Sequence, residues 1–194
     1  MVSQDNLFVT KRNGRGKESL NIDKIHSMVG YATENITGVS ASYVEMNSGL
    51  QFFDGITTED IQQILIKSAN DLITLENPNY QFVAARLLLF SLRKNLFHRL
   101  WEHPTFLQHI KTCLKRKVYD KSILDLYDES EIDRMGMWVD HERDYNFTYA
   151  GLRQVLDKYL VQDRSTNEIF ETPQFMYMMI AATIFANYPK ETRL

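Results

Sequence analysis

The sequence predicts a mainly α-helical protein with one small β-hairpin near its start and a second near its end. Two observations support this fold class. Apolar residues recur every three or four positions along most of the chain, which is the spacing of one helix face. Alternation with a period of two, which is typical of a strand, is confined to short stretches beside turn residues.

The first hairpin is expected around the dipeptide Asn13-Gly14. Residues 7–12 alternate apolar and polar side chains, and an Asn-Gly pair favours a tight turn because both residues tolerate positive φ. Residues 17–22 are the predicted return strand, and Gly16 makes the turn longer or bulged.

The helices that follow are predicted from caps and apolar stripes. Asp23 is the expected N-cap of the first helix, which ends before Asn35 and Gly38. Its apolar stripe is Ile25, Met28, Val29 and Ala32. A second helix is expected from Ser40 or Ser42 to about residue 52, where Asp54-Gly55 stops it. Thr57 or Thr58 caps a third helix, with acidic residues in its first turn. A long helix follows over 80–100, apolar on more than one side and therefore central to a helical bundle.

The second half of the chain begins after residues 101–104, where the helical pattern of the preceding segment ends. Helices are expected at 104–118, 121–127, 129–138 and 148–160. The stretch "VQDRSTNEIFE" predicts a short hairpin, and Thr172-Pro173 opens an apolar helix.

Composition excludes several classes of protein. The chain has 194 residues, 44% of them hydrophobic, and a net charge of −3, which argues against general nucleic-acid coating. Its single cysteine, Cys113, excludes an intramolecular disulfide framework and zinc-finger spacing, and we expect it to be a packing residue. The start lacks a signal-peptide core, and the longest apolar run is shorter than the ~20 residues that span a bilayer. A cytoplasmic protein with no membrane partner is the expectation.

The basic turn has two readings. Lys11, Arg12, Arg15 and Lys17 are either solvated charges on an exposed hairpin or part of an anion site. The second reading draws on other candidates: Lys24 on the first helical turn, the Thr58 hydroxyl at a helix N-terminus, and Lys94 on the long helix. Helix N-termini favour anions, and such a set can hold a triphosphate. No Walker loop and no GxGxxG motif is present.

Other motifs are weaker. No HExxH sequence occurs, and Asp140 to Glu142 is read as a charged loop in preference to a set of metal ligands. Arg116, in "KRK", suits the C-terminal turn of a helix. No pair of carboxylates is spaced recognisably for acid–base chemistry, so no catalytic residues are predicted.

Four blocks in order carry a family resemblance: "VTKRNG", "LNIDKI", "DGITTEDIQ" and "YQFVAARLLLFSLRK". Together they resemble the ATP-cone, the N-terminal regulatory domain of the class I ribonucleotide reductase large subunit. Later stretches, among them "HERDYNFTYAGLRQVLDKYLVQDRSTNEIFETPQF" and "ANYPKETRL", look like the helical segment that joins the cone to the catalytic barrel. The resemblance implies two domains: an ATP-cone over 1–98, and a helical segment over 99–194 that stops before the barrel.

The resemblance also implies a fold and a ligand. The cone is a four-helix bundle capped by a small β-hairpin or three-stranded sheet, and it binds ATP or dATP, with Mg²⁺, between these parts. Val9 lies near the base, and Glu18 and Asn21 contact the polar edges of adenine. The phosphates are held by a second set of residues: Lys11, Arg12, Lys24, Thr58 and Lys94.

Two departures from the family pattern bear on this site. Gln62 stands where many members have a histidine beside the sugar, and glutamine can hydrogen-bond but cannot carry charge. Discrimination between ATP and dATP is therefore expected to change. The turn "NGRGKE" is also one residue longer than in the family.

The function implied by the resemblance is allosteric control of the overall activity of a ribonucleoside-diphosphate reductase, and hence of deoxyribonucleotide synthesis for DNA replication. The implied partners are the small, radical-generating subunit and other large subunits. The parent would be an oxidoreductase, but this stretch alone is expected to be inactive because it lacks the catalytic and redox cysteines.

Three alternatives stay open. The first is a helical interaction module with a degenerate cone that no longer binds nucleotide. A cone-containing transcriptional regulator is disfavoured, because those carry a four-cysteine zinc ribbon. A stand-alone enzyme is the least supported, because no catalytic set is visible.

Overall fold

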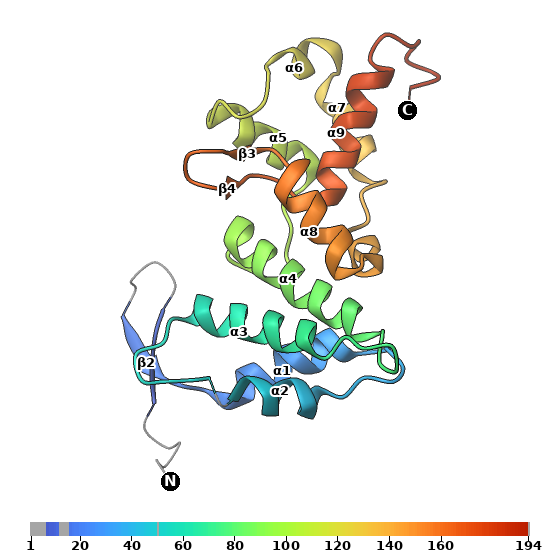
Figure 1. Cartoon of the computed structure of the whole chain (residues 1–194). Coiled ribbons are helices and arrows are strands. Elements are labelled where there is room, and N and C mark those ends of the chain that lie inside the picture. Colours follow the sequence, from blue (N-terminus) through green and yellow to red (C-terminus); the bar gives the residue numbers. More distant parts are fainter. Residues whose placement is uncertain (1–6, 12–15, 50, 194) are drawn as a thin grey trace. The chain divides into compact units, whose positions relative to one another are not determined.

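The computed structural model describes residues 7–11, 16–49 and 51–193. The chain is mainly helical and forms two compact units (Figure 1). The first unit comprises the residues up to Ser91 together with Tyr145–Leu152, and the second comprises Leu92–Asp144 and the residues from Arg153 onward. The expected domains, 1–98 and 99–194, stay a prediction, since helix α4 contributes to both units.

The first unit is a short hairpin followed by helices. Strand β1 (Phe8–Thr10) pairs antiparallel with β2 (Lys17–Ser19), and Val9 lies opposite Glu18. The expected turn at Asn13-Gly14, with Arg12 and Arg15, lies outside the described residues. The helices are α1 (Ile22–Thr33), α2 (Ala41–Gly49), α3 (Thr58–Asp71) and α4 (Tyr80–Phe97). In Figure 1 the hairpin stands at the end of the unit where α3 begins.

The caps of these helices correct one prediction and decide another. Asn21, and not Asp23, is the N-cap of α1: its backbone is extended, and its side chain accepts a hydrogen bond from the Lys24 N–H at 3.0 Å. Asp23 instead lies in the first turn, where a carboxylate suits the helix dipole. Thr57 caps α3 by accepting from the Asp60 N–H, so Thr58 is the first helical residue.

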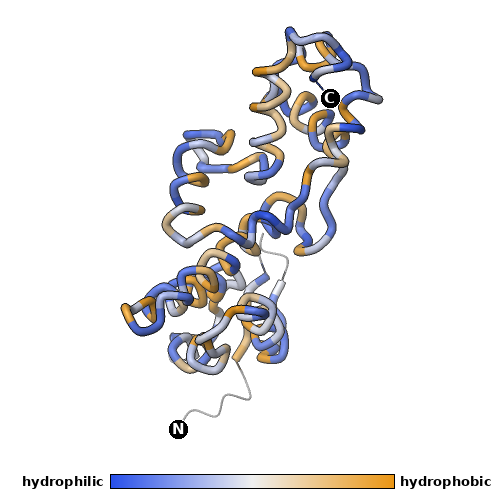
Figure 2. The backbone as a smooth tube through the Cα atoms, turned by 90° about the vertical axis from the view of Figure 1, so that its right-hand side faces the viewer, coloured by the Kyte–Doolittle hydropathy of each residue, from blue (hydrophilic) through white to orange (hydrophobic). Residues whose placement is uncertain are grey.

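The core of the first unit forms where the predicted stripes meet. Ile25, Met28, Val29 and Ala32 of α1 are buried, as expected. In α4, every residue from Val83 to Arg93 except Arg86 is buried, which confirms that this helix is central. Figure 2 shows apolar and polar residues alternating along the helices, as expected for helices with buried faces.

The second unit contains the end of α4 and a series of shorter helices. These elements are α5 (Phe106–Lys115), α6 (Ser122–Leu126), α7 (Glu129–Gly136), a 3₁₀ helix (His141–Asn146) that runs into the first unit, α8 (Tyr149–Lys158), which begins in the first unit, and α9 (Pro173–Phe185). The predicted second hairpin is present as β3 (Gln162–Asp163) and β4 (Glu168–Ile169). Aromatic and aliphatic side chains of α5, α6, α7 and α9 form the core, with Phe106, Ile110 and Phe175 at most 2% exposed.

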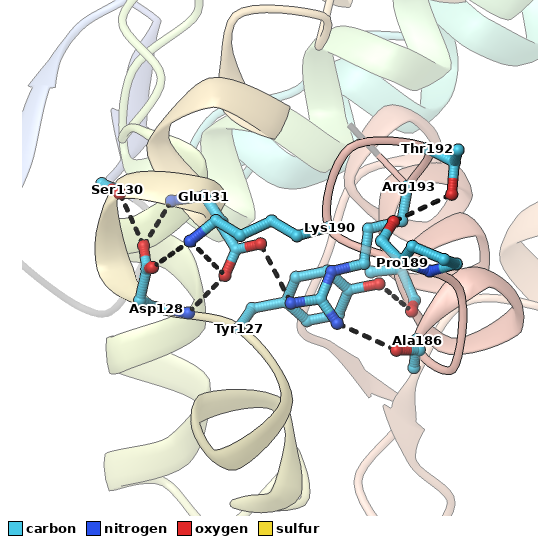
Figure 3. Close-up of polar contacts among 10 residues, drawn as sticks. Tyr127, Asp128, Ser130, Glu131, Ala186, Pro189, Lys190, Thr192 and Arg193 are labelled. Carbon is cyan, nitrogen blue, oxygen red and sulfur yellow. Dashed lines mark hydrogen bonds and ion pairs between the residues drawn. The ribbon is translucent and has the colours of Figure 1, made fainter.

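An ion-pair network fastens the segment after α9 to the start of α7 (Figure 3). Arg193 donates to Glu131 at 2.9 Å and lies over the Tyr127 ring, 4.3 Å from its centroid. Lys190 binds Asp128 at 2.7 Å and lies 3.5 Å from Glu131. Glu131 is only 2% exposed and Arg193 13%, so this pair is buried, whereas Lys190 and Asp128 are about half exposed at the surface.

Across the described residues, no helix is both long enough and apolar enough to cross a bilayer. The Phe175 to Phe185 stretch, which has the longest apolar run, forms most of α9.

Candidate functional site

The hairpin and the start of α1 bring several candidate residues together around one carboxylate. Lys11 follows β1, and its ammonium lies 2.9 Å from Glu18 on β2. Lys24, in the first turn of α1, lies 3.7 Å from the other oxygen of Glu18. Lys11 is two residues from Val9, which pairs with Glu18, so Lys11 and Glu18 are diagonal neighbours on one face of the hairpin.

The two cations change the acidity of that carboxylate. The hydrogen bond from Lys11 and the nearby charge of Lys24 lower the pKa of Glu18, so it is ionised at neutral pH. Glu18 is about one third exposed, Lys11 about half, and Lys24 70%. Ion pairs this exposed are weak and exchange readily with solvent or with a stronger anion.

The N-terminus of α3 lies against the same hairpin. Thr10 forms a parallel bridge with Thr57, and its N–H donates to the Ile56 carbonyl at 2.9 Å. The Phe8 N–H donates to the Asp54 carboxylate at 2.9 Å, and Gly55 returns a hydrogen bond to the Phe8 carbonyl. These bonds make the loop before α3 an added edge of the small sheet. They place Thr58 and the first amides of α3 beside β1.

Other predicted residues occupy different settings. Val9, on strand β1, is only 3% exposed, and the side chain of Asn21 caps the N-terminus of α1. Gln62 is 1% exposed and donates to the Leu87 carbonyl on α4. Lys94 lies in the last turn of α4, in the part assigned to the second unit, so its convergence with Lys11 stays a prediction. Arg12 lies outside the described residues.

A cavity of about 520 Å³ in the first unit was not anticipated from the sequence. Leu20, Ile25, Phe52 and Phe53 provide apolar walls, and the hydrogen-bonded pair of His26 and Glu45 forms part of the polar rim. The adjacent aromatic residues before Asp54-Gly55 were the available signal. A pair of large apolar side chains next to a turn often marks a surface that is only half covered.

The second unit holds a buried polar group of its own. His103 and His141 stack with their ring centroids 4.0 Å apart, and Arg93 donates to the His141 carbonyl at 2.7 Å. Burial lowers the pKa of His103 and of His109 to about 4 and that of His141 to about 3, so all three imidazoles are neutral. Burial has the opposite effect on Asp144 and raises its pKa to about 6.

Cys113 has the properties of a packing residue. It is 3% exposed on α5, and burial, with the nearby charge of Glu171, raises the pKa of its thiol to about 11. A neutral thiol is a poor nucleophile. Arg116, the C-cap of α5, pairs with both oxygens of Glu168 at 2.8 and 2.9 Å, so it is committed to the second hairpin.

No group of three or more His, Cys, Asp or Glu side chains within the described residues could hold a metal ion. This includes the Asp140 to Glu142 stretch, where the Asp140 carboxylate instead lies 3.6 Å from Arg143 and accepts from the Glu142 N–H. The stretch is charged as expected, but only Asp140 lies in a loop, because His141 and Glu142 begin the 3₁₀ helix.

Two family models match the chain. The ATP cone domain matches residues 7–95, and the ribonucleotide reductase all-alpha domain matches residues 145–193. The first match contains the hairpin, the Lys11–Glu18–Lys24 cluster and the N-terminus of α3. The chain belongs to the ribonucleotide reductase large-subunit family. It carries an ATP-cone followed by part of the helical region of that family, as the resemblance implied.

Curated relatives agree with this assignment. Ribonucleoside-diphosphate reductase 1 subunit alpha of Escherichia coli (strain K12) is 46% identical over 189 residues, which is 97% of this chain and 25% of that protein. The subunit alpha of Haemophilus influenzae is 45% identical over 188 residues, and that of Enterobacteria phage T4 is 39% identical over 174 residues. The chain spans about a quarter of the length of these reductase subunits.

Proposed function

We propose that the first unit is an allosteric effector site that binds ATP or dATP and regulates the overall activity of a ribonucleoside-diphosphate reductase. One observation carries the proposal: the Lys11–Glu18–Lys24 cluster lies on a hairpin that is hydrogen-bonded to the N-terminal end of α3, inside the segment that matches the ATP cone domain. Cations beside the N-terminus of a helix are suited to a polyphosphate.

In this proposal the phosphates displace Glu18 as the partner of the lysines. The proposed phosphate contacts are Lys11, Arg12, Lys24, Thr58 and Lys94. A triphosphate carries more charge than one carboxylate and offers more acceptor oxygens, so the exchange is favourable. A magnesium ion would arrive on the phosphates, because Mg²⁺ in nucleotide sites is bound largely by phosphate oxygens and water.

The base would lie on the other side of the same cluster. Val9 provides apolar contact, Glu18 accepts from the exocyclic amine of adenine once the lysines turn to the phosphates, and Asn21 reads a second polar edge. Gln62 stands on α3 at the position that the resemblance implies beside the sugar, but its side chain is buried.

Regulation further requires that the effector bind two assembly states with different affinity, because equal binding shifts no equilibrium. We propose that these states involve the small, radical-generating subunit and other copies of the large subunit. With glutamine at position 62, inhibition of the parent enzyme by dATP is expected to be weak or absent. Full inhibition by dATP in an activity assay would contradict this point.

Calorimetry of ATP and dATP with the 194-residue chain tests the effector site. We expect micromolar binding that Lys11→Ala and Lys94→Ala each weaken by at least tenfold, the loss of one charge-assisted phosphate contact. Lys67→Ala is the matched control, since Lys67 is an exposed lysine of α3 that pairs with Asp71. A folded chain that binds neither nucleotide would favour the degenerate cone, a helical interaction module.

A further inference from the structure

Gln62 is an unusual residue for its position. It lies in the second turn of α3 between the buried apolar residues Ile61 and Leu65, and its own exposure is 1%. Burying a primary amide among apolar side chains costs free energy unless its polar atoms find partners. A residue that occurs in such a place therefore needs a specific contact.

The structure supplies that contact across the helix–helix seam. The Gln62 side-chain amide donates to the backbone carbonyl of Leu87 on α4 at 2.9 Å. Leu87 is completely buried, and a carbonyl oxygen has two lone pairs, so it can accept from a side chain as well as within its helix. The bond joins residues that are 25 positions apart in the chain.

A single polar bond in an apolar seam acts mainly on register. Apolar side chains can pack in several offsets of nearly equal free energy, whereas a buried amide is satisfied in only one. Gln62 therefore fixes how far α3 is shifted along α4. Thr58 lies four residues earlier, on the same face of α3, so the same bond sets where the first turn of that helix stands.

We propose that Gln62 is a positioning residue of the effector site: through Leu87 it holds the α3 N-terminus in register, and it does so equally for ATP and dATP. This inference rests on the proposed function and refines the role of Gln62 within it. Its side chain presents almost no surface to a ligand, so it influences the nucleotide through Thr58 and the neighbouring amides. Gln62 then makes no contact with the 2′-hydroxyl that distinguishes ATP from dATP.

Two variants and one control test the proposal. Gln62→Met keeps the length and apolar packing of the side chain but removes the amide. Gln62→Glu keeps the shape but replaces the donor with a carboxylate that faces the Leu87 carbonyl. Gln63→Met makes the same chemical change at the neighbouring, exposed position. Each variant is measured by calorimetry with ATP and with dATP, and by thermal unfolding.

We expect Gln62→Met to separate binding from stability. Its melting temperature should stay within about 3 °C of the parent, because replacing a buried polar group with a well-packed apolar one is often neutral. Its affinity for both nucleotides should fall by a common factor, on the order of ten, the equivalent of one misplaced contact. Gln62→Glu should lose both melting temperature and affinity, and Gln63→Met should lose neither.

The possible results are distinct. A changed ratio of ATP to dATP affinity in Gln62→Met would mean direct contact with the sugar and would overturn the inference. Unchanged affinity for both nucleotides would overturn it as well, while leaving the effector site intact. If the parent chain itself bound neither nucleotide, the proposed function would fail first, and the positioning role with it.

Discussion

In each unit a glutamate pairs with two cations, and the two clusters differ chiefly in burial. In the first unit Glu18 pairs with Lys11 and Lys24 and is about one third exposed. In the second unit Glu131 pairs with Arg193 and Lys190 and is 2% exposed. The chemistry is similar, but its consequences for the protein are opposite.

Solvent accounts for the difference. Around Glu18, water screens the charges and can replace any of them, so the cluster contributes little to stability and its lysines can turn to another anion. Around Glu131, burial by itself would raise the carboxyl pKa, but the Asp128 N–H and the Arg193 guanidinium outweigh it and lower the pKa. A charge in that position is held by its partners and is costly to leave alone. The exposed cluster is suited to binding, and the buried one to holding the fold.

The largest expected effect is on the buried cluster. Arg193→Ala leaves the Glu131 carboxylate buried with the Asp128 N–H and Lys190 as its remaining partners, and it also removes the cation from the Tyr127 ring. We expect a loss of about 2–3 kcal/mol in the unfolding free energy, less than for a fully buried pair because Lys190 remains half exposed. Urea unfolding measures this loss.

Glu129→Gln is the matched control for that experiment. Glu129 lies on the same helix but is 61% exposed and pairs with Lys111, so its loss should change the unfolding free energy by less than about 1 kcal/mol. Equal effects of the two substitutions would show that burial does not distinguish the clusters.

The next effect is acid sensitivity of the second unit. His103, His109 and His141 have folded pKa values of about 3 to 4, below their ordinary value of 6.5. Their contribution to stability is complete above pH 6.5 and is lost as the pH falls toward 4. Asp144, raised to about 6 from 3.8, acts in the opposite sense: its proton favours the folded state as the pH drops below 6. Three histidines outweigh one aspartate, so unfolding takes up about two protons net near pH 5.

Hydrogen exchange at pH 7 and pH 5, corrected for intrinsic rates, checks this prediction. Protection of α5 should fall with acidification more than protection of α3, because His103, His109 and His141 all belong to the second unit. His103→Phe keeps an aromatic ring in the stack and should reduce the pH dependence by about one proton. An unchanged dependence would mean that His103 does not titrate on unfolding.

The sequence predicted those parts of this comparison that depend on local spacing. The helices and both hairpins follow from apolar periodicity and turn residues. The grouping of Lys11 with Lys24 was one of two readings of the basic turn, and the pairing of both lysines with Glu18 was not predicted. The N-cap of α1 was wrongly placed at Asp23, because Asn and Asp both suit a cap, and only the backbone decides which residue is extended.

Long-range partners could not be read from the sequence. Gln62 donates a hydrogen bond to Leu87, which is 25 positions away in the chain, and Arg193 donates to Glu131, which is 62 positions away. Neither pair has a local pattern, because the contact depends on how helices pack and not on their period. For the same reason the sequence singled out Gln62 only as a departure from the family, without indicating that it would be buried.

Smaller effects are expected at the start of α3, where Thr57 and Thr58 are predicted to have different roles. Thr57→Ala removes the N-cap and should cost about 1 kcal/mol of stability. Thr58→Ala leaves that cap in place and should instead weaken nucleotide binding, if its hydroxyl contacts phosphate. Thermal unfolding and calorimetry of both variants provide the test. Loss of stability in Thr58→Ala with no change in binding would exclude Thr58 from the site.

The smallest effect on stability is expected at the exposed cluster itself. Glu18→Gln removes the charge that occupies Lys11 and Lys24, and the melting temperature should not change measurably, because these ion pairs are solvated. The freed lysines should bind inorganic tripolyphosphate about two- to fivefold more tightly. Tripolyphosphate is the sharper probe here, since it reports on the lysines without the adenine contact proposed for Glu18.

Glu45→Gln is the control for this last prediction, because it makes the same change at a glutamate of the same unit that pairs with His26. Its tripolyphosphate affinity should equal that of the parent. If Glu18→Gln also leaves that affinity unchanged, Lys11 and Lys24 do not meet phosphate, and the exposed cluster is a solvated ion pair with no role in binding. If the affinity rises and then falls steeply with added salt, the lysines are held by Glu18 until a stronger anion replaces it. The exposed Glu18 would then release its lysines to a bound anion, whereas the buried Glu131 cannot release its partners without a loss of stability.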